Sequence, residues 1–146
     1  LLSFHLFMLR TETVKLPELT RPPDAEYKGH TAIIVLAHGE PETYDALPWI
    51  KLMKELDQQN TPFIPYPIRP FFFHSLRAKY LQVGKSSHNA ECLQIMQQME
   101  ALYRKEGDAT TKFYMSYLES TPHPDAAVIE ALNAGASRII LCNVFV

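Results

Sequence analysis

Two ionisable side chains directly follow apolar runs that are typical of buried strands. His38 comes after residues 31–37, and Glu119 comes after residues 112–118. Open α/β sheets bind their ligands at the carboxyl ends of the strands, so chemistry is expected at these two positions. An imidazole and a carboxylate together can hold Fe, Co, Ni or Zn, and a neutral histidine can accept a proton near pH 7. His38 and Glu119 are therefore candidate metal ligands and catalytic residues.

The same two residues also have a purely structural interpretation. A histidine after a strand is more often a turn residue or a satisfied hydrogen-bond donor than a ligand. The third predicted strand, 138–146, runs to the last residue, so the loop expected beside these two side chains would lie beyond Val146. The residue types alone leave both interpretations open.

Three further residues are candidates for contacting a substrate. Ser87 precedes a long predicted helix, Tyr44 lies at the start of an earlier one, and Arg69 flanks a proline-rich segment. A guanidinium can pair with a ligand carboxylate, whereas the alternative for Arg69 is a solvated surface side chain. The alternative for Ser87 is that it caps the helix that follows it.

Apolar runs and helical periodicity predict the elements that position these residues. Continuous apolar runs are typical of strands buried on both faces, and they predict strands at 31–37, 112–118 and 138–146. Helical spacing of apolar residues predicts helices at 43–58, 71–80, 89–106 and 125–134. Residues 61–70 contain four prolines, so we expect neither a helix nor a central strand there.

The order of these elements predicts an α/β fold. We expect an open, mostly parallel sheet with helices on both faces and right-handed crossovers, formed by residues 31–146. Residues 1–30 are expected to be a partly extended N-terminal extension, because Pro17, Pro22 and Pro23 remove backbone donors and fix φ. A sheet of this kind normally continues, so we interpret the chain as one lobe of a larger protein or as one copy of a homodimer.

Composition narrows the class of protein. The chain has 146 residues, of which 47% are hydrophobic and 21% charged, so one globular domain is expected rather than disorder. A net charge of −2 does not point to a nucleic-acid partner. Cys92 and Cys142 form no CxxC pair, and a reducing, cytoplasmic setting is expected. The apolar start at 1–9 is too short to span a membrane, and no transmembrane segment is predicted.

Three sequence blocks together resemble the class II chelatase superfamily, which contains the ferrochelatases and the sirohydrochlorin chelatases. Residues 33–41 are similar to the first strand of ferrochelatase and its small-residue-Gly-x-Pro exit. Residues 76–87 are similar to a ferrochelatase segment, R-Y-x-x-I-G-G-x-S-P-L, that leads into a long helix. Residues 113–122 with 128–141 are similar to the strand–Pro–helix–Gly–strand unit of the superfamily. The resemblance covers residues 31–146.

The departures from the family pattern matter for the site. Ser87 matches the family serine, but His88 and Asn89 replace the Pro-Leu that follows it, and Lys85 replaces the second glycine. In ferrochelatases the principal catalytic His and Glu lie in the second half of a two-lobed chain, which would be missing here. The long insert between the first strand and the long helix is similar to that of ferrochelatases and is absent from the short sirohydrochlorin enzymes.

Two short motifs instead resemble sirohydrochlorin chelatases. Their first strand also ends in His-Gly, and Leu118-Glu119 is similar to their F-L-E motif. In those enzymes the His, the Glu and a further His beyond the third strand hold the metal. The resemblance therefore implies metal binding by His38 and Glu119, with a third ligand beyond Val146.

The resemblance implies a function for the chain. It implies insertion of a divalent metal, Fe²⁺ or Co²⁺, into a tetrapyrrole such as protoporphyrin, a ferrochelatase-like step of haem biosynthesis without an organic cofactor. His38 would be a ligand or proton acceptor and Glu119 its anionic partner, while Ser87, Tyr44 and Arg69 would contact the substrate. Three alternatives remain: a sirohydrochlorin cobalt or iron chelatase, a non-catalytic tetrapyrrole- or metal-binding half-domain, or a structural half whose ligand site lies elsewhere.

Overall fold

A computed structural model describes residues 2–22 and 28–144 of the chain. The chain separates into two compact units. Residues 1–14 and 41–86 form the first, here called the helical unit, and residues 15–40 and 87–146 form the second, here called the sheet unit. The expected N-terminal extension, residues 1–30, is thus shared between the two units.

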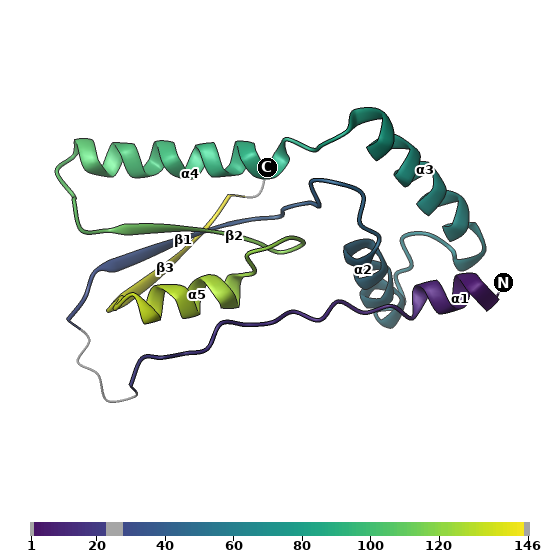
Figure 1. The fold of residues 1–146 in the computed structure, drawn as a ribbon, viewed down its shortest axis with the longest axis horizontal. Helices are drawn as coiled ribbons and strands as arrows, with labels where there is room; N and C mark the ends of the chain where they lie inside the picture. Colours follow the sequence, from purple (N-terminus) through teal and green to yellow (C-terminus); the bar gives the residue numbers. More distant parts are fainter. Residues whose placement is uncertain (1, 23–27, 145–146) are drawn as a thin grey trace. The chain divides into compact units, whose positions relative to one another are not determined.

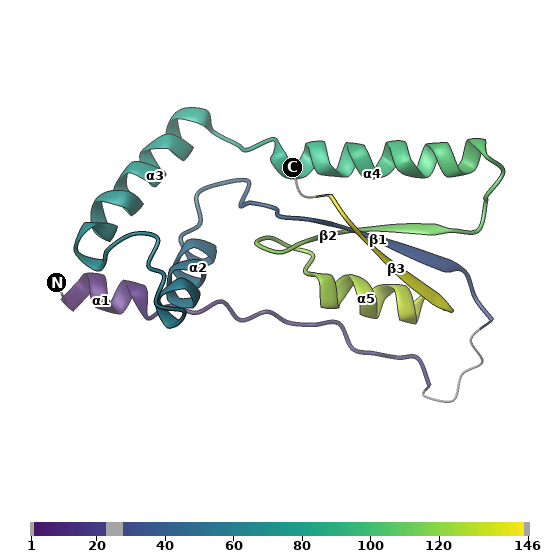
Figure 2. The ribbon, with the colours of Figure 1, turned by 180° about the vertical axis from the view of Figure 1, so that it is seen from behind.

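The sheet unit confirms the predicted fold class. Its parallel strands β1 (Thr31–Ala37), β2 (Lys112–Tyr117) and β3 (Arg138–Asn143) pair in the order β2-β1-β3. Helices α4 (His88–Lys105) and α5 (Pro124–Asn133) lie on opposite faces of this sheet (Figures 1 and 2). The expected open parallel sheet with helices on both faces is therefore present.

The two faces of the sheet follow from the alternation of side chains along β1. Ile33 and Val35 pack with Cys92 and Met96 of α4, whereas Ala32 packs with small residues that include Ala131 of α5. Because successive side chains of a strand point to opposite faces, one apolar run serves both helices. This explains why β1, the central strand, has no polar residue between Ala32 and Ala37.

The helical unit contains one helix that the sequence does not predict. Helix α1 (Leu2–Met8) packs against α2 (Leu47–Gln58) and α3 (Arg69–Val83), with Met8, Ile50 and Phe73 buried in one cluster. The apolar start of the chain is thus part of this core. Residues 10–22 carry no helix or strand, as expected for an extended arm.

Several predicted boundaries are wrong: α3 covers Arg69–Val83 rather than 71–80, and β3 ends at Asn143 rather than at 146, where residues 145–146 lie outside the described part of the chain. Helix α2 begins at Leu47 rather than at residue 43, because the Asp45 carboxylate accepts the Leu47 backbone N–H at 2.9 Å. The proline-rich segment is partly helical, because η1, a short 3₁₀ helix (Tyr66–Ile68), leads directly into α3. Proline is tolerated in the first turn of a helix, where backbone N–H groups have no intrahelical partner.

Candidate functional site

The two principal candidates lie at one edge of the sheet. Ala37 is paired with Tyr117 at the carboxyl ends of β1 and β2, so the residues after both strands emerge side by side. The His38 carbonyl accepts the backbone N–H groups of Leu118 at 3.1 Å and Glu119 at 2.9 Å. We call residues 38–40 and 118–120 the exit edge. The backbone of His38 therefore lies next to that of Glu119, as expected for residues that follow neighbouring parallel strands.

The His38 imidazole and the Glu119 carboxylate differ from other polar groups of the exit edge, because Ser120 Oγ accepts a hydrogen bond from Asn89 and Glu40 also has interaction partners. His38 is exposed and Glu119 is half-buried. Across residues 2–22 and 28–144, no hydrogen bond or ion pair engages the His38 imidazole or the Glu119 carboxylate. Neither group is therefore used by a hydrogen bond or ion pair in this part of the chain, and both remain open to a ligand.

The exit edge is held by a residue of α4 that the sequence analysis did not select. The Asn89 side chain, in a residue only 7% exposed, forms a two-bond contact with the backbone of Glu40. Its Oδ1 accepts the Glu40 N–H at 3.0 Å, and its Nδ2 donates to the Glu40 carbonyl at 2.8 Å. The same Nδ2 donates to Ser120 Oγ at 3.2 Å. One amide thus ties both loops of the exit edge to α4.

Two further residues complete this attachment. The buried Tyr117 hydroxyl donates to the Asn89 carbonyl at 2.9 Å. Gly39 has φ +74°, and a Cβ at this position would lie 2.6 Å from Cβ of Tyr117. Only glycine adopts this conformation at no steric cost and leaves room for the tyrosine. A glycine after a strand was the sequence signal for this close approach.

Ser87 is close to this edge in sequence and structure but does not have the expected capping role. It occupies the residue before α4, yet its side chain makes no bond to a backbone N–H of the first turn. Its hydroxyl instead donates to the Glu91 carboxylate at 2.6 Å. The prediction that the hydroxyl caps the helix is therefore wrong, and Ser87 remains an exposed residue two positions before Asn89.

The two other substrate-binding candidates belong to the helical unit. Tyr44 is half-buried, and its ring packs edge-on against Tyr80 with the centroids 6.2 Å apart. Burial raises the pKa of the Tyr44 hydroxyl, while the cationic side chains of Arg77 and Arg10 partly offset this. The hydroxyl therefore stays protonated in neutral solution and is available as a hydrogen-bond donor.

The Arg69 side chain is not solvated at the surface, and its guanidinium is not available to bind a ligand. It is 2% exposed, and its guanidinium donates to both Asp57 carboxylate oxygens, at 2.8 and 2.5 Å. The Arg69 Nε donates to the Ile64 carbonyl at 2.9 Å. The guanidinium carbon, Cζ, lies 5.3 Å from the centroid of the Tyr66 ring. The hydrogen bond from Arg69 lowers the pKa of Asp57. This planar pairing fixes the start of α3, so we do not retain Arg69 among the substrate contacts.

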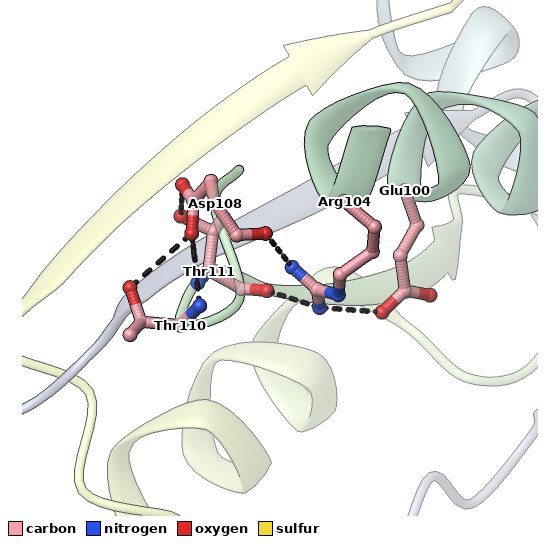
Figure 3. Close-up of polar contacts among 5 residues, drawn as sticks. All are labelled: Glu100, Arg104, Asp108, Thr110 and Thr111. Carbon is pink, nitrogen blue, oxygen red and sulfur yellow. Dashed lines mark hydrogen bonds and ion pairs between the residues drawn. The ribbon is translucent and has the colours of Figure 1, made fainter. Parts of the chain in front are cut away.

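A second polar cluster lies at the opposite end of the sheet unit, in the turn between α4 and β2 (Figure 3). The Asp108 carboxylate accepts two backbone N–H groups and two hydroxyls, all from Thr110 and Thr111. Arg104 donates to the carbonyls of Asp108 and Thr111 and to Glu100. The hydroxyl and backbone N–H groups hold the pKa of Asp108 far below its ordinary value. We call these five residues the turn cluster.

Comparisons with known proteins add no family to these observations. No protein-family model, curated protein or solved structure matches the chain. Among the helices of the described ranges, none is long and apolar enough to cross a membrane. Within those ranges there is also no group of three or more His, Cys, Asp or Glu side chains that could hold a metal ion. The described residues therefore supply no larger ligand set to which His38 and Glu119 belong.

Proposed function

We propose that this chain inserts a divalent metal into a tetrapyrrole such as protoporphyrin, in a reaction like that of the ferrochelatases. The observation that carries the proposal is the exit edge: an unengaged imidazole and an unengaged carboxylate on adjacent loops at the carboxyl ends of parallel strands. The metal is a substrate in this reaction, and Fe²⁺ and Co²⁺ are among the ions that one nitrogen and one oxygen ligand can hold.

A delivery role requires that the ion is not enclosed by a complete set of protein ligands. Sites that retain a metal permanently usually supply three or four protein ligands. Within the described residues His38 and Glu119 are the two proposed ligands, so positions on the ion would be open to water and to the pyrrole nitrogens of the substrate.

The chemistry of insertion assigns a task to each side chain. Two pyrrole N–H protons must leave as the metal enters the ring, and a neutral imidazole is a suitable acceptor near pH 7. His38 is exposed at the strand end, where it can bind the ion or take up a proton. The Glu119 carboxylate offsets the charge of the ion. A cytoplasmic setting, expected from two cysteines that are both free thiols, is part of the same proposal.

The test measures metal insertion directly. The protein is incubated with Fe²⁺ or Co²⁺ and either protoporphyrin or sirohydrochlorin, and the absorption spectrum of the metallated product is followed. We expect metallated protoporphyrin from the wild-type protein and at least ~100-fold slower formation with His38→Ala or Glu119→Gln, which is the usual contribution of a positioned acid–base group. The matched controls are His74→Ala and Glu106→Gln, which alter exposed residues that are not part of the exit edge.

Each other outcome identifies a different function. Product from sirohydrochlorin alone would support the sirohydrochlorin chelatase alternative. Bound pigment without product would indicate a non-catalytic tetrapyrrole-binding domain. Equal rates for the His38 variant and the His74 control would overturn the assignment of chemistry to the exit edge.

A further inference from the structure

Asn89 differs from His38 and Glu119 because its side-chain amide is used within the fold and is not available to a ligand. Its side chain forms three hydrogen bonds, to the N–H and carbonyl of Glu40 and to Ser120 Oγ. The residue is 7% exposed. An amide used in this way is a connector between segments rather than a binding group.

The segments that Asn89 connects are the two loops that carry the proposed ligands. Glu40 lies two residues after His38, and Ser120 lies one residue after Glu119. The first loop is fixed at both ends, because the His38 carbonyl accepts N–H groups from the second loop and Glu40 is held by Asn89. The attachments leave His38 and Glu119 on loops whose backbones have little freedom to separate.

The backbone of Asn89 is itself hydrogen-bonded to the sheet. The Tyr117 hydroxyl donates to the Asn89 carbonyl in a buried setting, and Tyr117 is the last residue of β2. Asn89 is also in the first turn of α4, an 18-residue helix. The position of the connector is therefore set by rigid elements, as a supporting residue for a site requires.

We infer that Asn89 is a positioning residue that sets the separation of His38 and Glu119 for a divalent ion. The inference rests on the proposed function, since it concerns the same pair of ligands. Residues that orient metal ligands through hydrogen bonds typically contribute 10–100-fold to metal affinity. Without the hydrogen bonds of Asn89, the two loops would become ordered only when the ion binds. The entropic cost of ordering them would then weaken ion binding, whereas in the wild-type protein it is part of folding.

The experiment compares Co²⁺ binding to wild-type protein and to Asn89→Leu, a substitution that replaces the amide with an apolar side chain of similar size and so removes all three bonds. Co²⁺ alone is the probe, and its visible absorption reports affinity and ligand geometry. We expect a ~10–100-fold weaker affinity for Asn89→Leu. Hydrogen exchange at the Glu40 amide, which Asn89 Oδ1 accepts, should become faster in this variant.

The matched control is Thr111→Val, which removes a buried hydroxyl from the other end of β2. It should lower stability while Co²⁺ affinity stays the same, so it separates a positioning effect from a general loss of stability. If Asn89→Leu does not fold, Ser120→Ala decides the question, because it removes one bond of the connector from the loop of Glu119. A Co²⁺ affinity in Ser120→Ala lower than in wild type supports the inference.

The outcomes separate this inference from the proposed function. Wild-type protein that neither binds Co²⁺ nor inserts metal overturns the proposed function, and the inference falls with it. Wild-type binding with equal affinity in Asn89→Leu, or in Ser120→Ala where that variant replaces it, overturns the inference alone.

Discussion

Two polar clusters lie beside opposite ends of strand β2, each with a carboxylate and a nitrogen-bearing side chain, and the two clusters use these groups in opposite ways. In the turn cluster, before β2, the Asp108 carboxylate accepts four hydrogen bonds and the Arg104 guanidinium donates three. In the exit edge, after β2, neither the His38 imidazole nor the Glu119 carboxylate has a partner in the described part of the chain. Groups satisfied within the fold stabilise it, whereas groups left open are available for a ligand.

The comparison also concerns how each end is ordered. The turn cluster is local, because its bonds join residues no more than seven positions apart. The exit edge is ordered from a distance, because Asn89 bonds Glu40 across 49 residues and Ser120 across 31. The turn cluster joins the end of α4 to the turn that follows it, whereas the exit edge needs both the sheet and the first turn of α4 to be in place.

The largest expected effect is on activity at the exit edge. His38→Ala should slow metal insertion at least ~100-fold, while the free energy of unfolding changes by less than about 0.5 kcal/mol because the side chain is exposed and unbonded. Paired rate measurements and denaturant titrations check both parts. A large loss of unfolding free energy would mean that the His38 imidazole has a structural role. The exit edge would then not differ from the turn cluster in how it uses its polar groups.

The next effect couples stability and activity at the exit edge. Gly39→Ala forces a side chain into a backbone with φ +74° and against Tyr117, so we expect a loss of about 2 kcal/mol in unfolding free energy. The His38 loop must shift, and insertion should slow more than in a surface control such as Glu106→Gln. Unchanged stability would show that the Gly39 position tolerates a Cβ.

A smaller effect is expected in the turn cluster. Thr111→Val removes a hydroxyl that donates to Asp108 at 2.6 Å in a residue 5% exposed, and should cost about 1 kcal/mol of unfolding free energy. Insertion by the folded protein should be unchanged. A reduced rate in the fully folded variant would mean that the two ends of β2 are functionally connected.

The smallest effect appears only in acid. The folded state holds the pKa of Asp108 below its ordinary value of 3.8, first through the Thr111 hydroxyl and then through backbone N–H groups. The unfolded chain therefore binds a proton at higher pH than the folded protein, so this stabilisation is complete above the unfolded pKa and is lost as pH falls toward the folded pKa. In Asp108→Asn, denaturation midpoints between about pH 4 and pH 2 should fall less steeply than in wild type. Parallel slopes would contradict this assignment.

The sequence was sufficient for the parts of the fold that depend on local pattern. The apolar runs predict all three strands and their parallel pairing, and helical spacing predicts α4 and α5 to within about one or two residues. The placement of His38 and Glu119 together also follows from the sequence, because carboxyl ends of neighbouring parallel strands meet at one edge. Boundaries fail where proline is involved: η1 and the start of α3 lie in a segment whose composition argued against any helix.

Only the tertiary structure decided which polar groups are used within the fold. Nothing in the residues around Arg69 indicates that it is buried against Asp57, and nothing around Asn89 indicates that it connects both exit loops. The incorporation of α1 into the helical unit is a third example, since an apolar start of seven helical residues finds its partners more than forty residues away. The physical reason is the same in each case. Periodicity reports which side of an element faces away from water, whereas the partner of a hydrogen bond depends on where the packing of other elements places a donor or acceptor.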